Sequence, residues 1–223
     1  MNVIEQEFDA LAPEYESNRL SAWYQAHGAE LLEYVPPLEE GDILDIGCGT
    51  GHFLRQYLTK HPHARGVGLD LSYSMIDEAR RRADAEGIAN VTFLKGNWED
   101  IGRDLFSSYD FSVIVCANAF HYFTDPQAAT GKMFHLINDG GSLYILERDK
   151  SRSLLTFLWG FLHRVWIKDH VIFYDNKEML GMLVKAGFSN ARVIRSIKRY
   201  FWKNKLFTSI VLLECHKSSK AEP

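Results

Sequence analysis

Cysteine is scarce in this sequence, and its three copies, Cys48, Cys116 and Cys215, lie far apart along the chain. This spacing gives neither a disulfide framework nor a close cysteine pair, and it is typical of a protein from a reducing compartment. We therefore expect a cytoplasmic location. The nine histidines show no metal-ligand spacing, so metal catalysis is not predicted.

Proline-rich stretches, low-complexity stretches and long uninterrupted apolar runs are missing too. The amino terminus has acidic residues where a secretory signal would have basic and then apolar ones, so no signal peptide is predicted. The most apolar segment, residues 153–175, is interrupted by His163, Arg164 and Lys168, and is too short to span a bilayer. We expect one domain over residues 1–223 without a transmembrane segment.

Positive charge is sparse over residues 1–150, where acidic residues outnumber basic ones, and it is concentrated in residues 151–223. Much of it alternates with apolar residues in a way that predicts two antiparallel strands, about residues 191–200 and 206–216, with solvated basic faces. An anionic partner is the functional alternative. The net charge of -4 and the lack of an appended RNA-binding module favour no nucleic acid binding.

What the chain does contain is a glycine-rich turn between a strand and a helix. Residues 42–54 read DILDIGCGTGHFL, in which a buried-strand pattern precedes Gly47, Gly49 and Gly51. Glycine permits positive φ and lets the backbone approach a ligand. The apolar spacing that follows predicts a helix whose first N–H groups favour an anion. A nucleotide-like cofactor site is the leading interpretation, and a tight structural turn is the simpler alternative.

A second apolar strand, residues 66–69, ends in Asp70, which lies 25 positions after Asp45. This is close to the offset of about 20 residues at which a βαβ unit presents a carboxylate to ribose hydroxyls. Asp70 is therefore the predicted ribose ligand. A helix N-cap belongs instead to Ser72 or Ser74.

The loop spacing separates two classes of cofactor. It reads G-x-G-x-G, whereas the dinucleotide fingerprint is G-x-G-x-x-G, which weakens the alternative of a nicotinamide-dependent oxidoreductase. With LDIGCGTG at residues 44–51 and GVGLDLS at residues 66–72, the chain resembles the class I S-adenosylmethionine-dependent methyltransferases. The resemblance covers residues 8–150 well and the rest more loosely. It implies S-adenosyl-L-methionine as cofactor and an α/β fold, with a Rossmann-like, seven-stranded, mostly parallel sheet, helices on both faces and a C-terminal antiparallel hairpin.

The resemblance also implies which residues contact the cofactor. Asn97, where the family more often has Asp, and Trp98 take the adenine position, although a strand end and a core residue are the alternative reading. The fourth strand, expected over residues 111–120, is implied to end beside the reacting methyl group. The implied cofactor residues are Tyr15, Asp45, Gly47, Cys48, Gly49, Gly51, Asp70, Leu71, Met75, Asn97, Trp98, Cys116, Ala117 and Asn118.

His121, which follows the fourth strand, is the candidate general base, and Tyr122 is a weaker one. A methyl sulfonium is already activated, so we expect in-line positioning and exclusion of water to dominate catalysis. A base is needed only when the acceptor is a hydroxyl, an acidic carbon or a protonated amine. Two alternatives stay open: His121 only holds backbone in place, or the protein binds S-adenosylmethionine without catalysis.

Two segments are expected to flank the cofactor and the acceptor. Residues 1–35 resemble the helical cover of small-molecule methyltransferases. Residues 150–174 predict a helical lid insertion in which Trp159, Phe161 and Trp166 line a pocket for a small apolar or aromatic acceptor. In the alternative, this helix packs against the domain or against a second copy of the chain, as in a homodimer. The sequence identifies neither the acceptor nor the atom that is methylated.

Overall fold

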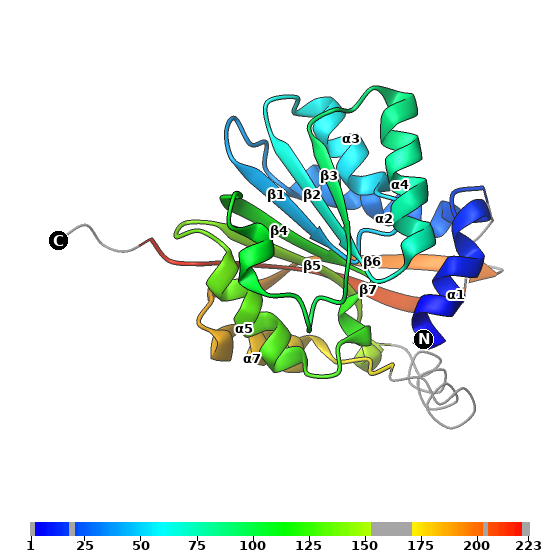
Figure 1. Cartoon of the computed structure of the whole chain (residues 1–223). Helices are drawn as coiled ribbons and strands as arrows, with labels where there is room; N and C mark the ends of the chain where they lie inside the picture. The colour runs from blue at the N-terminus through cyan, green and yellow to red at the C-terminus, as the bar shows by residue number, and fades with distance from the viewer. Residues whose placement is uncertain (1–2, 18–20, 153–170, 203–204, 220–223) are drawn as a thin grey trace. The chain divides into compact units, whose positions relative to one another are not determined.

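The computed structural model describes residues 3–17, 21–152, 171–202 and 205–219 (Figure 1). Seven strands form one sheet in the order β3-β2-β1-β4-β5-β7-β6. The chain divides into two compact units, Met1–Ala117 and Asn118–Pro223. The predicted mostly parallel α/β sheet with a C-terminal antiparallel hairpin is confirmed.

The first unit contains four parallel strands, in which β1 pairs with both β2 and β4, and β2 pairs with β3. Every residue of β1 is buried, both its three apolar residues and the aspartates Asp42 and Asp45. The strands are β1 (Asp42–Ile46), β2 (Arg65–Asp70), β3 (Val91–Lys95) and β4 (Phe111–Ala117). At the amino end of β1, the Asp42 carboxylate accepts two hydrogen bonds from Arg65, of 2.7 and 2.8 Å, which join β1 to β2.

Helices of the first unit pack against these strands and against one another (Figure 1). They are α1 (Val3–Leu11), the 3-10 turn η1 (Ala12–Glu14), α2 (Ser21–Tyr34), α3 (His52–Lys60), α4 (Tyr73–Glu86) and the 3-10 turn η2 (Arg103–Phe106). Ser72 is the N-cap of α4, as predicted, because its hydroxyl accepts a hydrogen bond of 3.1 Å from the Met75 N–H.

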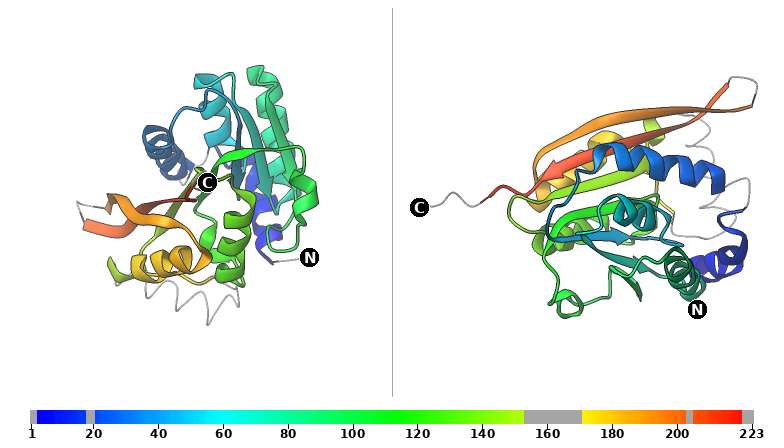
Figure 2. Two further views of the ribbon diagram at one scale, coloured as in Figure 1. Left: turned by 90° about the vertical axis from the view of Figure 1, so that its left-hand side faces the viewer. Right: turned by 90° about the horizontal axis from the view of Figure 1, so that it is seen from above.

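The second unit contains three strands, with β7 antiparallel to both β5 and β6. Figure 2 shows β6 and β7 side by side for most of their length, with α5 and α7 packed together nearby. Its elements are η3 (Phe120–Tyr122), α5 (Pro126–Leu136), β5 (Ser142–Arg148), η4 (Lys150–Arg152), α7 (Asn176–Ala186), β6 (Ser189–Trp202) and β7 (Lys205–His216).

One predicted boundary is wrong. The fourth strand ends at Ala117 and does not reach Phe120, because Asn118 has a φ of 54° and turns the chain out of the extended conformation. Most of the predicted lid, with Trp159, Phe161 and Trp166, lies outside the described residues. Only the ends of residues 150–174 are described.

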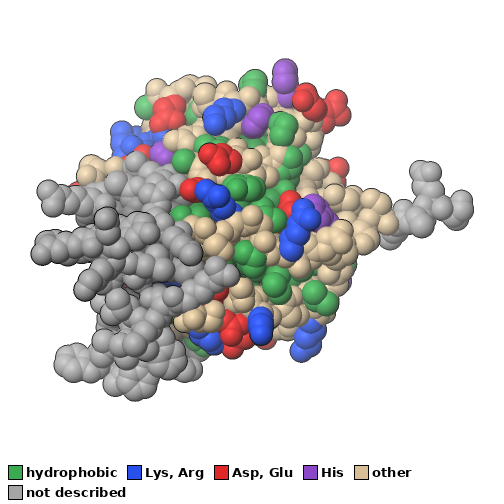
Figure 3. Space-filling view, turned by 180° about the vertical axis from the view of Figure 1, so that it is seen from behind, with side chains coloured by type: hydrophobic (Ala, Val, Ile, Leu, Met, Phe, Trp, Pro, Cys, Tyr) green, Lys and Arg blue, Asp and Glu red, His purple; other side chains and the backbone are tan. Residues whose placement is uncertain are grey.

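The described surface mixes charge and apolar area. Acidic, basic and apolar side chains are interspersed on the face shown in Figure 3. No described helix combines the length and the apolar character that crossing a bilayer demands. Across the same residues, no cluster of three or more histidine, cysteine or acidic side chains is arranged to hold a metal ion.

Candidate functional site

The predicted glycine loop connects β1 to α3. Its glycines Gly47, Gly49 and Gly51 all have positive φ, of 74°, 53° and 73°. A Cβ on Gly51 would lie 2.5 Å from the Phe93 ring, so both the backbone and the space require glycine there. In the described chain no side chain caps the amino end of α3, so its first N–H groups stay available to a ligand.

Asp70 ties the end of β2 to this loop. Its Oδ2 accepts a hydrogen bond of 2.8 Å from the Gly49 N–H, and its Oδ1 accepts one of 2.9 Å from the Ser72 N–H. Burial raises the pKa of Asp70, and the backbone hydrogen bonds oppose that rise. Asp70 therefore organises the loop in addition to its predicted role as a ribose ligand.

Asp45 is the least satisfied polar group of the loop region. Its side chain lies at the end of β1 with 3 % of its surface exposed, and among the described residues nothing hydrogen-bonds its Oδ1. Burial, with the charge of nearby Asp70 added, raises the pKa of Asp45 to about 8. A buried acid with an unmet acceptor beside the half-buried Asp70 fits a ligand that brings positive charge and hydrogen-bond donors.

The other predicted cofactor residues of the first unit differ in their surroundings. Cys48 and Met75 are buried, and burial raises the pKa of the Cys48 thiol well above its usual range. Leu71 is half-buried. Tyr15 reaches the glycine loop, since a Cβ on Gly49 would lie 3.9 Å from its ring.

Asn97 and Trp98 are both engaged by neighbouring protein groups. Asn97 Nδ2 donates to Asp100 Oδ2 at 2.8 Å, and its Oδ1 accepts from the Glu99 N–H at 3.2 Å. Trp98 is buried and packs against Phe106, with ring centroids 6.3 Å apart. These contacts join neighbouring protein groups to one another, and the adenine role of Asn97 and Trp98 stays a prediction.

The second unit places His121 beside a buried carboxylate that the sequence analysis missed. His121 Nδ1 lies 2.8 Å from Glu147 Oε2, and the His121 N–H donates to the same oxygen at 3.3 Å. Burial would raise the pKa of Glu147, but the charge and hydrogen bond of His121, with the Arg148 N–H, hold it below its usual value. The ionised carboxylate can only accept a hydrogen bond, so Nδ1 is assigned as the donor to Glu147. Nε2 is then the ring nitrogen that could accept a proton.

Aromatic rings surround this pair. The His121 ring lies 4.1 Å from the Tyr122 ring and 5.1 Å from the Phe173 ring, measured between centroids. Phe120 packs edge-on against Tyr174 at 5.8 Å. The main chain is fixed as well, because the Ile172 N–H donates to the His121 carbonyl at 3.0 Å. A buried histidine–glutamate pair among aromatic rings is suited to proton transfer with an aromatic molecule.

Three predicted cofactor residues lie where β4 ends: Cys116 and Ala117 are its last two residues, and Asn118 follows it. Cys116 is fully buried, and Ala117 and Asn118 are half-buried. The Asn118 N–H donates to the Leu146 carbonyl at 2.8 Å, which holds the chain at the point where it leaves the extended conformation.

Glu16 is the second functional residue that the sequence analysis missed. It lies next to Tyr15 and accepts hydrogen bonds from Thr50 in the glycine loop, from Arg55 and from Arg82. A contact so distant in sequence leaves no signal in helical or strand spacing, so only the fold reveals it.

Comparisons with known proteins agree with this geometry. A family model described as a methyltransferase domain matches residues 38–187. A demethylmenaquinone methyltransferase of Thermus thermophilus is 31% identical over 194 residues, which is 84% of this chain and 80% of that protein. A ubiquinone/menaquinone biosynthesis C-methyltransferase of a Ruegeria species is 25% identical over 182 residues, covering 73% and 72%. The solved structure of an S-adenosylmethionine-dependent methyltransferase from Thermotoga maritima matches with a TM-score of 0.71 and 20% identity, covering 96% of this chain and 100% of that one.

Proposed function

This chain belongs to the methyltransferase domain family, as a class I S-adenosylmethionine-dependent methyltransferase, and we propose that its acceptor is a small aromatic ring compound of the demethylated quinol type. The methyl group goes to a ring carbon next to a hydroxyl. The names of the Thermus and Ruegeria relatives support this class of acceptor. The observation that carries the proposal is the His121–Glu147 pair among aromatic rings.

The residues of the first unit fit the cofactor. Asp45 and Asp70 supply buried carboxylates, one with an unmet acceptor, and the uncapped amino end of α3 supplies N–H donors. S-adenosylmethionine when bound supplies a methyl group activated by a sulfonium. The glycine loop and Asp70 would hold it, and Asp45 would compensate its positive charge. The G-x-G-x-G spacing supports this cofactor over the nicotinamide-dependent alternative, whose fingerprint has a wider glycine spacing.

His121 is the proposed general base. Carbon methylation requires the acceptor hydroxyl to lose a proton, because the resulting ring oxyanion makes the neighbouring carbon nucleophilic. His121 Nε2 takes that proton, and Glu147, which accepts from Nδ1, orients the ring and stabilises the imidazolium that forms. The methylated ring carbon then loses its hydrogen as a proton to water and the oxygen regains a proton, which restores the aromatic ring. Tyr122, whose ring packs on His121, is the weaker alternative.

An acceptor assay with matched variants tests this proposal. We expect a demethylated naphthoquinol with a ring deuterium to be methylated in preference to a hydrophilic primary amine, with loss of the deuterium by mass spectrometry. His121→Gln should lower kcat by about 100-fold or more and leave S-adenosylmethionine affinity unchanged. The control is His135→Gln, an exposed histidine of the same unit. Preference for the amine, retention of the deuterium, or a wild-type kcat for His121→Gln would contradict the proposal.

Further proposals concern the setting of the reaction. The thiols of Cys48, Cys116 and Cys215 are buried, and no disulfide is seen among the described residues, which supports action in a reducing compartment such as the cytoplasm. We also propose one catalytic domain with a helical cover and a lid, and a small-molecule acceptor in place of nucleic acid. The alternative to the lid is that the apolar segment packs against a second copy of the chain in a homodimer.

A further inference from the structure

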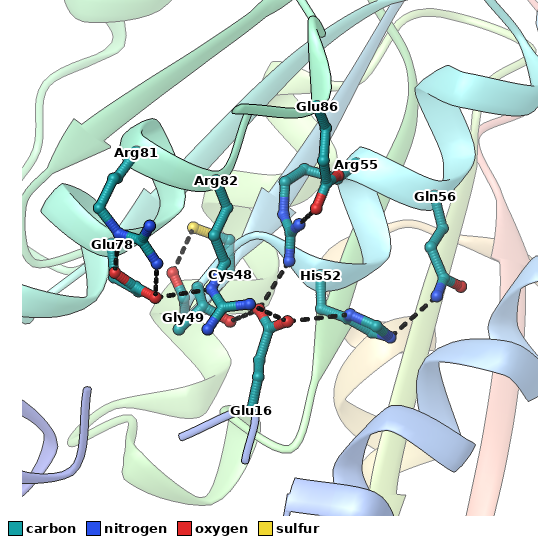
Figure 4. A network of polar contacts seen from close by, with 11 residues as sticks. Glu16, Cys48, Gly49, His52, Arg55, Gln56, Glu78, Arg81, Arg82 and Glu86 are labelled. Carbon is teal, nitrogen blue, oxygen red and sulfur yellow. Dashed lines mark hydrogen bonds and ion pairs between the residues drawn. The ribbon is translucent and has the colours of Figure 1, made fainter. Parts of the chain in front are cut away.

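The Glu16 side chain lies among donors from three parts of the first unit (Figure 4). Its Oε1 accepts hydrogen bonds from Thr50 Oγ1 and from Arg55 Nη2, each of 2.6 Å. Its Oε2 accepts from Arg82 Nη1 at 3.0 Å and lies 3.6 Å from His52 Nδ1. Only 11% of the side chain is exposed. One carboxylate therefore joins the glycine loop, α3 and α4.

The groups that hold Glu16 are themselves held in place. Arg55, with 3% of its side chain exposed, also pairs with Glu86 at the end of α4. Arg82 also donates to Glu78 at 2.7 Å. Removing the Glu16 charge leaves the guanidinium of Arg55 and that of Arg82 with one anion fewer in a half-buried place, which is costly. The network therefore prefers Glu16 in position.

Polar contacts attach the segment that carries Glu16, and among its described residues 3–17 only Ala12 is buried. In the described chain no residue of α1 is buried. Asp9 Oδ1 accepts from Ser72 Oγ at 2.5 Å and from the Ser74 N–H at 3.0 Å, and Glu5 lies 3.0 Å from Lys95 Nζ. An element with so little apolar burial opens at low cost in free energy.

These contacts lie around the cofactor residues. Thr50 is part of the glycine loop, and Ser72 donates its N–H to Asp70. Tyr15, directly before Glu16, is the residue nearest to a Cβ built on Gly49. Release of the Glu16 carboxylate thus frees the residue that covers the loop.

We propose that Glu16 is a positioning residue for the cofactor. Its carboxylate holds residues 3–17, with Tyr15, against the glycine loop, and so sets the rate at which S-adenosylmethionine and S-adenosylhomocysteine leave. The inference concerns cofactor retention alone and is independent of the proposed acceptor.

Glu16→Gln tests the role of the charge, because glutamine keeps the size and still accepts from Thr50. We expect S-adenosylhomocysteine to dissociate about tenfold faster in stopped-flow fluorescence, the size of change that the loss of a charge-assisted hydrogen bond causes. KM for S-adenosylmethionine should rise while kcat does not fall. Hydrogen exchange in residues 3–17 should accelerate. Glu14→Gln is the control, since the exposed Glu14 lies two positions away and carries the same charge.

Arg82→Gln provides a second variant that does not depend on Glu16 itself tolerating change. Arg82 is 25% exposed, and its loss should accelerate cofactor dissociation in the same direction. In the double variant, the increase in the dissociation rate should be smaller than the product of the increases in the two single variants, because the two residues act through one contact. Wild-type dissociation and exchange rates in Glu16→Gln and Arg82→Gln would overturn the proposal. No acceptor is present in these assays, so failure of the acceptor proposal is seen separately.

Discussion

At the scale of single residues, the cofactor region places acids in opposite electrostatic surroundings. Asp45 is buried beside another acid, and its pKa rises to about 8. Glu16 is also partly buried, which would raise its pKa, but His52, Thr50, Arg55 and Arg82 hold that pKa at about 2. The ionised form of Asp45 would be stabilised by a positive charge from a ligand, whereas that of Glu16 is already stabilised by positive charges of the protein.

This difference predicts proton release when the cofactor binds. With a pKa of about 8, Asp45 is mostly protonated at pH 7 in the cofactor-free protein, and a cationic cofactor favours its ionised form. Titration calorimetry at pH 7 in two buffers of different ionisation enthalpy should therefore show release of about one proton. Asp45→Asn should release none and bind more weakly. A binding enthalpy that does not depend on the buffer in the wild type would contradict this assignment.

At the scale of elements, the helices differ in how they begin. In α7, Asp175 Oδ1 accepts from the Glu178 N–H at 2.8 Å while Glu178 Oε2 accepts from the Asp175 N–H at 2.7 Å. This capping box gives the N–H groups of Asp175 and Glu178 side-chain acceptors at the start of the helix. In contrast, α3 begins at Gly51 without a side-chain cap in the described chain. The first N–H groups of α3 therefore have no side-chain acceptor in the described chain, whereas those of α7 have one in Asp175.

Removing a cap should therefore affect stability alone. We expect Asp175→Ala to lower the free energy of unfolding by about 1 kcal/mol, as measured by urea denaturation. Because α7 lies in the second unit and Asp175 contacts none of the cofactor residues described, S-adenosylmethionine affinity should stay at the wild-type value. A loss of affinity comparable to the loss of stability would argue against a purely structural role.

Gly51→Ala should affect both properties. Alanine at a φ of 73° costs about 1–2 kcal/mol, and its Cβ would meet the Phe93 ring at 2.5 Å. We expect lower stability together with weaker cofactor binding by calorimetry. Gly131→Ala, in α5 with open space around the added Cβ, is the control and should be neutral or stabilising. Wild-type affinity in Gly51→Ala would show that the loop conformation is not needed for binding.

At the scale of the whole molecule, Glu16 and Asp45 make the stability of the fold depend on pH in opposite directions. Glu16, whose folded-state pKa is lowered to about 2, adds stability above about pH 4.5, and this stability disappears as pH falls toward 2. Asp45 does the reverse, because its folded-state pKa is raised to about 8. Between about pH 4 and pH 8 the unfolded chain has already lost that proton while the folded chain retains it, so stability falls as pH rises.

The cofactor-free protein should consequently be most stable at acidic pH, between about pH 4 and pH 4.5. Urea midpoints measured from pH 3 to pH 8 test this expectation. Asp45→Asn should flatten the alkaline side of the profile, and Glu16→Gln should flatten the acidic side. Saturating S-adenosylmethionine should also flatten the alkaline side, since it favours the ionised Asp45. A profile that rises steadily to pH 8 in the wild type would refute the assignment of a raised pKa to Asp45.

The amino-acid sequence by itself determined the parts of this protein that depend on local spacing. The glycine loop after a buried strand, the acid at the end of the next strand and the Ser72 cap were all predictable, since strand and helix periods and glycine conformations are properties of neighbouring residues. The antiparallel hairpin was predictable for the same reason. These features also carried the resemblance that the family comparisons confirmed.

Only the tertiary structure decided which charged side chains meet. Glu16 contacts residues 34, 39 and 66 positions away, and Glu147 contacts His121 across 26 positions. Asp45 has an unusual pKa because packing removes water from it and brings Asp70 near. Such effects depend on distance in space and on burial, and neither follows from the period of a strand or a helix. For that reason the sequence predicted the glycine loop, while the fold revealed the charged groups that lie around it.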